Sequence, residues 1–182
     1  MELTEKERKD LLDLALSTIK AELEGKELPG VKEATPILRE KRGAFVTLKK
    51  RGQLRGCIGY IQPIKPLHET IERMALAAAF EDPRFPALRK EELKDLSVEI
   101  SVLTPLKEIR DVGEIRVGVH GLYLVRGPRS GLLLPQVAVE YGWDTETFLR
   151  ETCHKAGLPP EAWRDEGTRI YVFSAEIFGD LS

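Results

Sequence analysis

Apolar residues recur at helical spacing in several segments of the chain. Thr4 and Glu7 form a capping box, in which a hydroxyl and a carboxylate each bind a free backbone N–H, and this predicts a helix that follows. Gly25 is expected to end that helix. The residues expected to pack on the core are Leu12, Leu16, Ile19 and Leu23.

Three further helices are predicted from the same signals. One follows Pro66, and its expected buried stripe consists of Leu67, Ile71, Met74 and Ala78. A short helix starts at Pro135 and continues through Tyr141. Asp144 caps the last helix, which ends near Gly157 and carries Cys153 on its apolar side.

Runs of β-branched and alternating residues predict the strands. Residues 43–48 and 54–61 form a hairpin around the turn at 50–52, and residues 97–102 alternate strictly between apolar and polar. Further strands are expected at 116–119, 122–125, 132–134 and 169–178. Helices and strands mix without a regular βαβ order, which favours an α+β fold with a mixed or antiparallel sheet flanked by helices. We expect residues 1–182 to form a single domain.

Composition narrows the class of protein. Of the 182 residues, 42% are hydrophobic, which is typical of an ordered globular protein, and 32% are charged, which is more than usual. The sequence has no asparagine and only two cysteines, and this depletion together with abundant Glu and Lys indicates a thermophilic source. No apolar run reaches membrane-spanning length, so we expect a cytoplasmic protein without a disulfide framework.

Charge is unevenly distributed along the chain. The net charge is −2, yet residues 39–55 hold seven basic residues against one acidic residue. This basic segment could attract nucleic acid or an acidic protein. The chain as a whole is acidic, and few aromatic residues lie between the basic ones. Both observations weigh against a protein that coats nucleic acid.

Residues 54–60 (Leu-Arg-Gly-Cys-Ile-Gly-Tyr) contain the main candidate for chemistry. Alternate side chains of a strand share a face, so Arg55, Cys57 and Gly59 are expected to point the same way. A cationic neighbour stabilises a thiolate, which would make Cys57 a nucleophile. Gly56 and Gly59 leave room beside it, either for a ligand or for a packed helix. On residue types alone, a small, buried and inert Cys57 remains an equal alternative.

Four other residues are secondary candidates for binding. Asp82 and Arg84 lie in a loop held by two prolines, where they form either a structural ion pair or a ligand clamp. His120 precedes a glycine and could titrate near neutral pH, although a histidine that caps a turn is an equal alternative. Gln136 lies at a helix start, from which its amide can project into a cleft. No metal-ligand motif is present, so neither a metal nor another cofactor is expected.

The ordered motifs resemble one protein family over nearly the whole chain. They are residues 43–48 (Gly-Ala-Phe-Val-Thr-Leu), 54–59 (Leu-Arg-Gly-Cys-Ile-Gly), 82–85 (Asp-Pro-Arg-Phe), 98–105, 120–121 (His-Gly), 131–136 (Gly-Leu-Leu-Leu-Pro-Gln) and 153–158. This set is similar to the AMMECR domain family. The resemblance implies an α+β fold of two unequal lobes with a cleft, but no activity, because the biochemical role of that family is unsettled. It marks Arg55, Gly56, Cys57 and Gly59 as the functional surface.

Three functions remain open from the sequence. The first is an enzyme or small-molecule-binding protein, in which Cys57, activated by Arg55, acts on an anionic or carbonyl substrate and a histidine such as His120 or His154 serves as base. The second is a module that binds nucleic acid or protein through residues 39–55. The third is a purely architectural role for residues 54–60.

Overall fold

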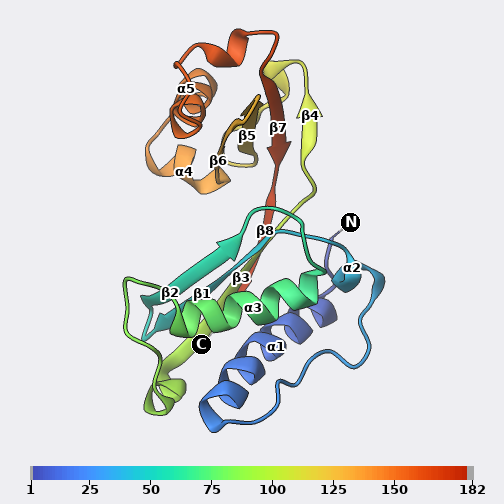
Figure 1. The fold of residues 1–182 in the computed structure, drawn as a ribbon, viewed down its shortest axis with the longest axis vertical. Helices are drawn as coiled ribbons and strands as arrows, with labels where there is room; N and C mark the ends of the chain where they lie inside the picture. The colour runs from blue at the N-terminus through green and yellow to red at the C-terminus, as the bar shows by residue number, and fades with distance from the viewer. Residues whose placement is uncertain (1, 180–182) are drawn as a thin grey trace. The chain divides into compact units, whose positions relative to one another are not determined.

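Two four-stranded antiparallel sheets organise the chain in the computed structural model, which describes residues 2–179 (Figure 1). Each sheet belongs to its own compact unit with its own hydrophobic core. The first unit consists of the chain up to Leu103 and of the segment that begins at Glu176. The second unit is Thr104–Ala175. The predicted α+β class is confirmed, and the prediction of a single domain with a cleft stays a prediction.

The first unit contains two long helices and one sheet in the strand order β2-β1-β3-β8. Its elements are α1 (Glu5–Glu24), α2 (Pro36–Arg39), β1 (Ala44–Lys50), β2 (Gln53–Tyr60), α3 (Leu67–Phe80), the 3-10 helix η1 (Lys90–Asp95), β3 (Leu96–Leu103) and β8 (Ala175–Gly179). Helices α1 and α3 pack against each other and on one face of the sheet (Figure 1). Strand β2 lies at one edge of this sheet.

The core of the first unit lies between this sheet and the two helices. On β1 the side chains of Ala44, Val46 and Leu48 are fully buried, and on β3 the expected inward residues Val98, Ile100 and Val102 are buried as well. Strand alternation therefore places Phe45, Thr47 and Lys49 on the opposite face, which α1 and α3 leave uncovered. No helix in residues 2–179 is long and apolar enough to cross a membrane.

The second unit packs two helices on a sheet in the order β4-β7-β5-β6. Its elements are β4 (Lys107–Ile109), the 3-10 helix η2 (Val112–Glu114), β5 (Gly121–Arg126), β6 (Arg129–Leu133), α4 (Pro135–Glu140), α5 (Thr145–Lys155), the 3-10 helix η3 (Ala162–Arg164) and β7 (Arg169–Phe173). Leu122 and Leu124 of β5 meet Phe148 and Leu149 of α5 in its core. Cys153 is fully buried in the same core, as its position on the apolar stripe predicts.

The predicted strand at 116–119 is wrong, because this segment forms a turn. The backbone N–H of Val119 and that of His120 both donate to the carbonyl of Arg116. Gly118 adopts a φ of 92°, which side chains rarely tolerate and which breaks an extended chain. The edge strand of this sheet is β4, which pairs with β7 and which the sequence did not predict, because three residues are too short to show a pattern.

The predicted strand at 169–178 is divided at Ser174 into β7 and β8, which belong to different sheets. Thr104 and Ser174 bind each other here, since the N–H of Thr104 donates to the Ser174 carbonyl and the N–H of Ser174 donates to the Thr104 hydroxyl. The sequence predicts one strand here because both halves are strands and only their pairing partners differ.

Helix α1 buries a different stripe from the predicted one. Ile19 is fully buried as expected, but Leu12, Leu16 and Leu23 are only partly buried. The buried positions are Leu11, Leu14, Ala15, Thr18, Ile19 and Ala21. Leucines occupy several sides of this helix, so periodicity alone did not fix which side meets the sheet and α3.

We predict that Gly56→Ala destabilises the first unit. A methyl group at Gly56 would overlap the main-chain carbonyl oxygen of Ala78 on α3, so strand and helix would have to separate. The free energy of unfolding should fall by about 1–3 kcal/mol, the usual cost of overpacking, in urea denaturation. Gly167→Ala is the matched control, because its new methyl would meet nothing within 4 Å. Equal stability of the two variants would contradict the close contact between β2 and α3.

Candidate functional site

Cys57 lies in the middle of the edge strand β2, where the residue is partly exposed and its thiol is not in a disulfide. It pairs directly with Thr47 of β1, and the Thr47 hydroxyl lies 3.1 Å from the Cys57 sulfur. Because Thr47 is on the sheet face that α1 and α3 leave uncovered, the thiol occupies that face as well. Either atom can be the donor of this contact, which links the side chain of Cys57 to the neighbouring strand β1.

The backbone of Cys57 is held by two side chains from the loop that follows α3. The N–H of Cys57 donates to Oδ2 of Asp82 at 3.0 Å, and the carbonyl of Cys57 accepts from Nη2 of Arg84 at 3.4 Å. A neighbouring strand would normally supply this donor and this acceptor. The Asp82–Arg84 pair therefore takes the place of a further strand at the sheet edge, which unpaired would invite association with another chain.

The Asp82–Arg84 pair is itself closely connected. Arg84 donates to both carboxylate oxygens, from Nε at 3.0 Å and from Nη2 at 2.8 Å, and its backbone N–H adds a third bond at 3.0 Å. Asp82 is buried, whereas the side chain of Arg84 is 55% exposed. Pro83 and Pro86 restrict the backbone on either side of this ring of bonds. The loop thus presents one guanidinium group to solvent beside the thiol.

Hydrogen bonds determine the ionisation of this pair. The bonds from the Arg84 side chain, followed by the two backbone N–H groups, hold the pKa of Asp82 well below its usual range. The bond to Asp82 raises the pKa of Arg84, and the nearby Cys57 adds a smaller effect in the same direction. Asp82 is therefore a permanent anion and Arg84 a permanent cation at neutral pH.

Arg55 does not form the expected pair with Cys57 on one strand face. Leu48 of β1 pairs with Gly56 and Lys49 pairs with Leu54, so the register shift skips Arg55 and interrupts the alternation. Arg55 is buried, and it donates to Oε1 of Glu92 at 3.0 Å, to Oε2 at 3.1 Å and to the Pro86 carbonyl at 2.9 Å. Its role is to fasten β2 to η1 and to the proline-held loop.

The two glycines beside Cys57 are explained by packing within the first unit. Gly56 leaves space for the backbone of α3 at Ala78, which is the helix-packing alternative considered for it. Gly59 pairs with Phe45 across the strands, and the Phe45 ring covers the space above it. Neither glycine needs a ligand to account for it, so their assignment as binding residues stays a prediction.

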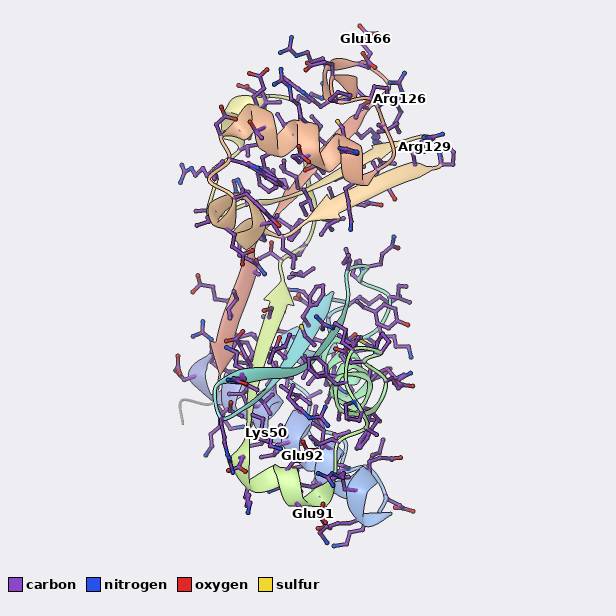
Figure 2. All side chains as sticks on the ribbon, turned by 90° about the vertical axis from the view of Figure 1, so that its left-hand side faces the viewer. Lys50, Glu91, Glu92, Arg126, Arg129 and Glu166 are labelled. Atoms are coloured by element: carbon purple, nitrogen blue, oxygen red, sulfur yellow. The ribbon has the colours of Figure 1, made fainter. Side chains whose placement is uncertain are left out.

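Acidic neighbours neutralise most of the basic segment 39–55. Arg42 pairs with Glu40, Lys49 with Glu99, Lys50 and Arg55 with Glu92, and Arg51 with Asp95. Figure 2 labels Lys50 and Glu92, whose charged groups lie 3.1 Å apart. Three of these four acidic partners, Glu92, Asp95 and Glu99, lie in η1 and β3, outside residues 39–55, so a sequence window counts the cations without them.

Sequence reasoning missed Thr47, Phe85 and Glu92. The guanidinium groups of Arg55 and Arg84 lie 5.9 Å and 5.5 Å from the centre of the Phe85 ring, so this ring links both arginines. Thr47 could have been found only from the strand register, which sets Thr47 opposite Cys57. Glu92 carries no sequence signal, because it is one acidic residue in a charged segment.

The remaining candidates, His120, Gln136 and His154, belong to the second unit. His120 is partly buried, and its Nδ1 accepts the backbone N–H of Arg116, the contact expected of a histidine that caps a turn. Gln136 is exposed in the first turn of α4, and His154 is exposed on α5. In the described part of the chain, no three His, Cys, Asp or Glu side chains gather as metal ligands.

Fold and site together define an α+β protein with two antiparallel sheets and a cysteine on a loop-capped edge strand. The model of the AMMECR1 family matches residues 12–178. The chain belongs to the AMMECR1 family, as the motifs in its sequence predict.

Similar proteins occur in archaea. A protein of Methanothermobacter thermautotrophicus is 48% identical over 183 residues, which cover 97% of this chain and 95% of the relative. Protein PH0010 of Pyrococcus horikoshii is 51% identical over 164 residues, or 85% of this chain and 80% of the relative. The crystal structure of uncharacterized protein PH0010 from Pyrococcus horikoshii matches with a TM-score of 0.77 and 48% identity, covering 94% of this chain and 90% of that one. These sources agree with the predicted thermophilic origin.

We predict that Glu92 makes the stability of the first unit depend on pH below neutrality. The bonds from Arg55, then from the Arg89 backbone and Lys50, lower the pKa of Glu92 from 4.5 to about 2. A lowered folded-state pKa stabilises the fold fully above pH 4.5, and this contribution is lost as pH falls toward 2. Glu92→Gln should remove that part of the pH dependence in urea denaturation.

At pH 7 the same variant should lose about 3–5 kcal/mol, because it leaves the buried Arg55 without its counter-charge. Glu91→Gln is the control, since Glu91 is the exposed neighbour on η1 (Figure 2). If Glu92→Gln and Glu91→Gln had the same acid-denaturation curve, the pairing of Glu92 with Arg55 would not stabilise the fold.

Proposed function

We propose that this protein binds a small anionic substrate beside Cys57 and uses the thiol as its nucleophile, with Arg84 as the group that attracts the anion. The observation that supports this most is the contact between the exposed Arg84 guanidinium and the backbone carbonyl of Cys57, a partly exposed residue with a free thiol. Arg84 here takes the role that strand alternation assigned to Arg55. A free thiol at Cys57 also agrees with the cytoplasmic location that the sequence predicts.

The chemistry follows from the groups around the sulfur. Nη1 of Arg84 binds no residue in the part of the chain that the structure describes, so its N–H groups can bind a carboxylate or a phosphate. The sulfur of Cys57 then adds to an electrophilic carbon such as a carbonyl. A C–S bond forms from the sulfur lone pair, the π electrons move to the carbonyl oxygen, and the thiol proton passes to a base or to solvent.

The alternative function is a module that binds nucleic acid or protein through residues 39–55. Arg39 and Lys41 support it, since neither forms an ion pair with a described residue. The other five basic residues are paired with acids, and their contribution to an attractive field is correspondingly small. Binding of RNA at low salt that weakens steeply with added salt would favour this alternative over the thiol site.

We predict that Cys57 reacts preferentially with a negatively charged reagent. At neutral pH, iodoacetate and iodoacetamide should both label Cys57, as followed by mass spectrometry, while the buried Cys153 stays unlabelled as an internal control. Arg84→Gln should lower the ratio of the iodoacetate rate to the iodoacetamide rate about fivefold, because a charge pair at contact distance in water contributes about 1 kcal/mol.

Arg73→Gln is the matched control for this experiment. Arg73 is also a partly exposed arginine of the first unit paired with a carboxylate, that of Glu81, but it does not contact Cys57. Its removal should leave the ratio of rates unchanged. An unchanged ratio in Arg84→Gln, or a Cys57 no more reactive than Cys153 in the folded protein, would contradict the proposed function.

A further inference from the structure

A cavity in the second unit collects two cations around His120. It has a volume of about 360 Å³ and is formed by β4, η2, the turn at 116–120 and β7. Lys107, Arg116 and His120 line it together with one carboxylate, that of Glu114. Ile109, Val119 and Val172 supply its apolar wall. This volume lies within the range of small-molecule sites in proteins.

The backbone of the turn fixes the tautomer of His120. Its Nδ1 accepts the N–H of Arg116 at 3.0 Å, so in the neutral ring the single proton is on Nε2. Burial, and then the charges of Arg116 and Lys107, lower the pKa of His120, and Glu114 opposes this only weakly. At neutral pH the imidazole is therefore an uncharged donor with no free lone pair.

This arrangement selects an anion over a metal ion. A metal would need a lone pair on a ring nitrogen, yet Nδ1 is engaged and Nε2 carries the proton. The cavity is lined by two permanent cations, Lys107 and Arg116, and by one carboxylate, Glu114. The ion pair between Lys107 and Glu114 is long at 3.7 Å. Arg116 is exposed and forms no ion pair with any residue from 2 to 179. The unpaired guanidinium of Arg116 and the neutral ring N–H of His120 are groups that bind an oxyanion.

We propose that this cavity binds a small oxyanion, the carboxylate or phosphate group of a small molecule, through Arg116, Lys107 and the Nε2–H of His120. The apolar wall of Ile109, Val119 and Val172 receives the rest of that molecule. The residues of this site all belong to the second unit, whereas Cys57 belongs to the first unit. Binding of the anion favours the protonated imidazole, and by linkage the anion binds more tightly as His120 gains its proton.

Imidazole nitrogen NMR tests this proposal. The chain has three histidines, and His68 and His154 serve as internal references because neither lines the cavity. Inorganic phosphate and acetate are titrated separately through the millimolar range at neutral pH, with sodium chloride holding the ionic strength constant. The nitrogens of His120 alone should shift to saturation, and the pKa of His120 should rise in the presence of the bound anion.

Arg116→Gln is the informative variant, because it keeps the backbone N–H that His120 accepts. It should weaken anion binding about tenfold or more, as expected for a lost charge-assisted hydrogen bond. Arg110→Gln is the control, since Arg110 is an exposed arginine of the same unit outside the cavity. Saturation with phosphate alone, with acetate alone or with both identifies the anion group that the site accepts. An unmoved His120, or equal affinity in the wild type and Arg116→Gln, would overturn the proposal.

Discussion

The carboxylate of Asp82 is the group on which the arrangement around Cys57 depends. It accepts hydrogen bonds from the Cys57 backbone, from the Arg84 backbone and from two nitrogens of the Arg84 side chain. Being buried and ionised, it needs all these donors to offset the cost of leaving water. The same bonds close the edge of the sheet, fix the loop and hold Arg84 beside the thiol. The structural ion pair of Asp82 and Arg84 therefore also contains the guanidinium group that we propose attracts the anion.

Two arginines near Cys57 have opposite roles because their burial differs. Arg55 is only 8% exposed and both ends of its ion pair with Glu92 are withdrawn from solvent, so it serves the fold. Arg84 is bound to Asp82 along one edge of its guanidinium but keeps its other nitrogen toward solvent, so it can also serve a ligand. The Phe85 ring lies near both guanidinium groups and so links the buried arginine to the exposed one.

The sequence predicted much of the fold and the residues of the candidate site, but it did not give the contacts among those residues. Periodicity and caps placed the helices from Thr4, Pro66 and Asp144, since these signals act within one turn of chain. Alternation placed β1 and β3 for the same reason. The motif of residues 54–59 predicted Cys57 as the candidate nucleophile. Family membership and the α+β class followed from motif order, which needs no geometry.

What the sequence could not supply are relations between distant segments. The bulge at Arg55 depends on the register between β1 and β2. Because this register skips one residue, Arg55 binds Glu92 and does not share a strand face with Cys57. The division of residues 169–178 depends on Thr104, which is 70 residues from Ser174. The edge-closing bonds from Asp82 to Cys57 likewise join residues that only the folded chain brings together.

Amide hydrogen exchange at Cys57 tests this account most directly. The backbone N–H of Cys57 is bonded to a side chain rather than to a strand, so its protection should depend on Asp82 alone. In Asp82→Ala the exchange of this amide should accelerate about tenfold or more relative to wild type, while the amides of β1 and β3 keep their protection. Equal protection of the Cys57 amide in both proteins would contradict the claim that Asp82 closes the sheet edge and positions the thiol site.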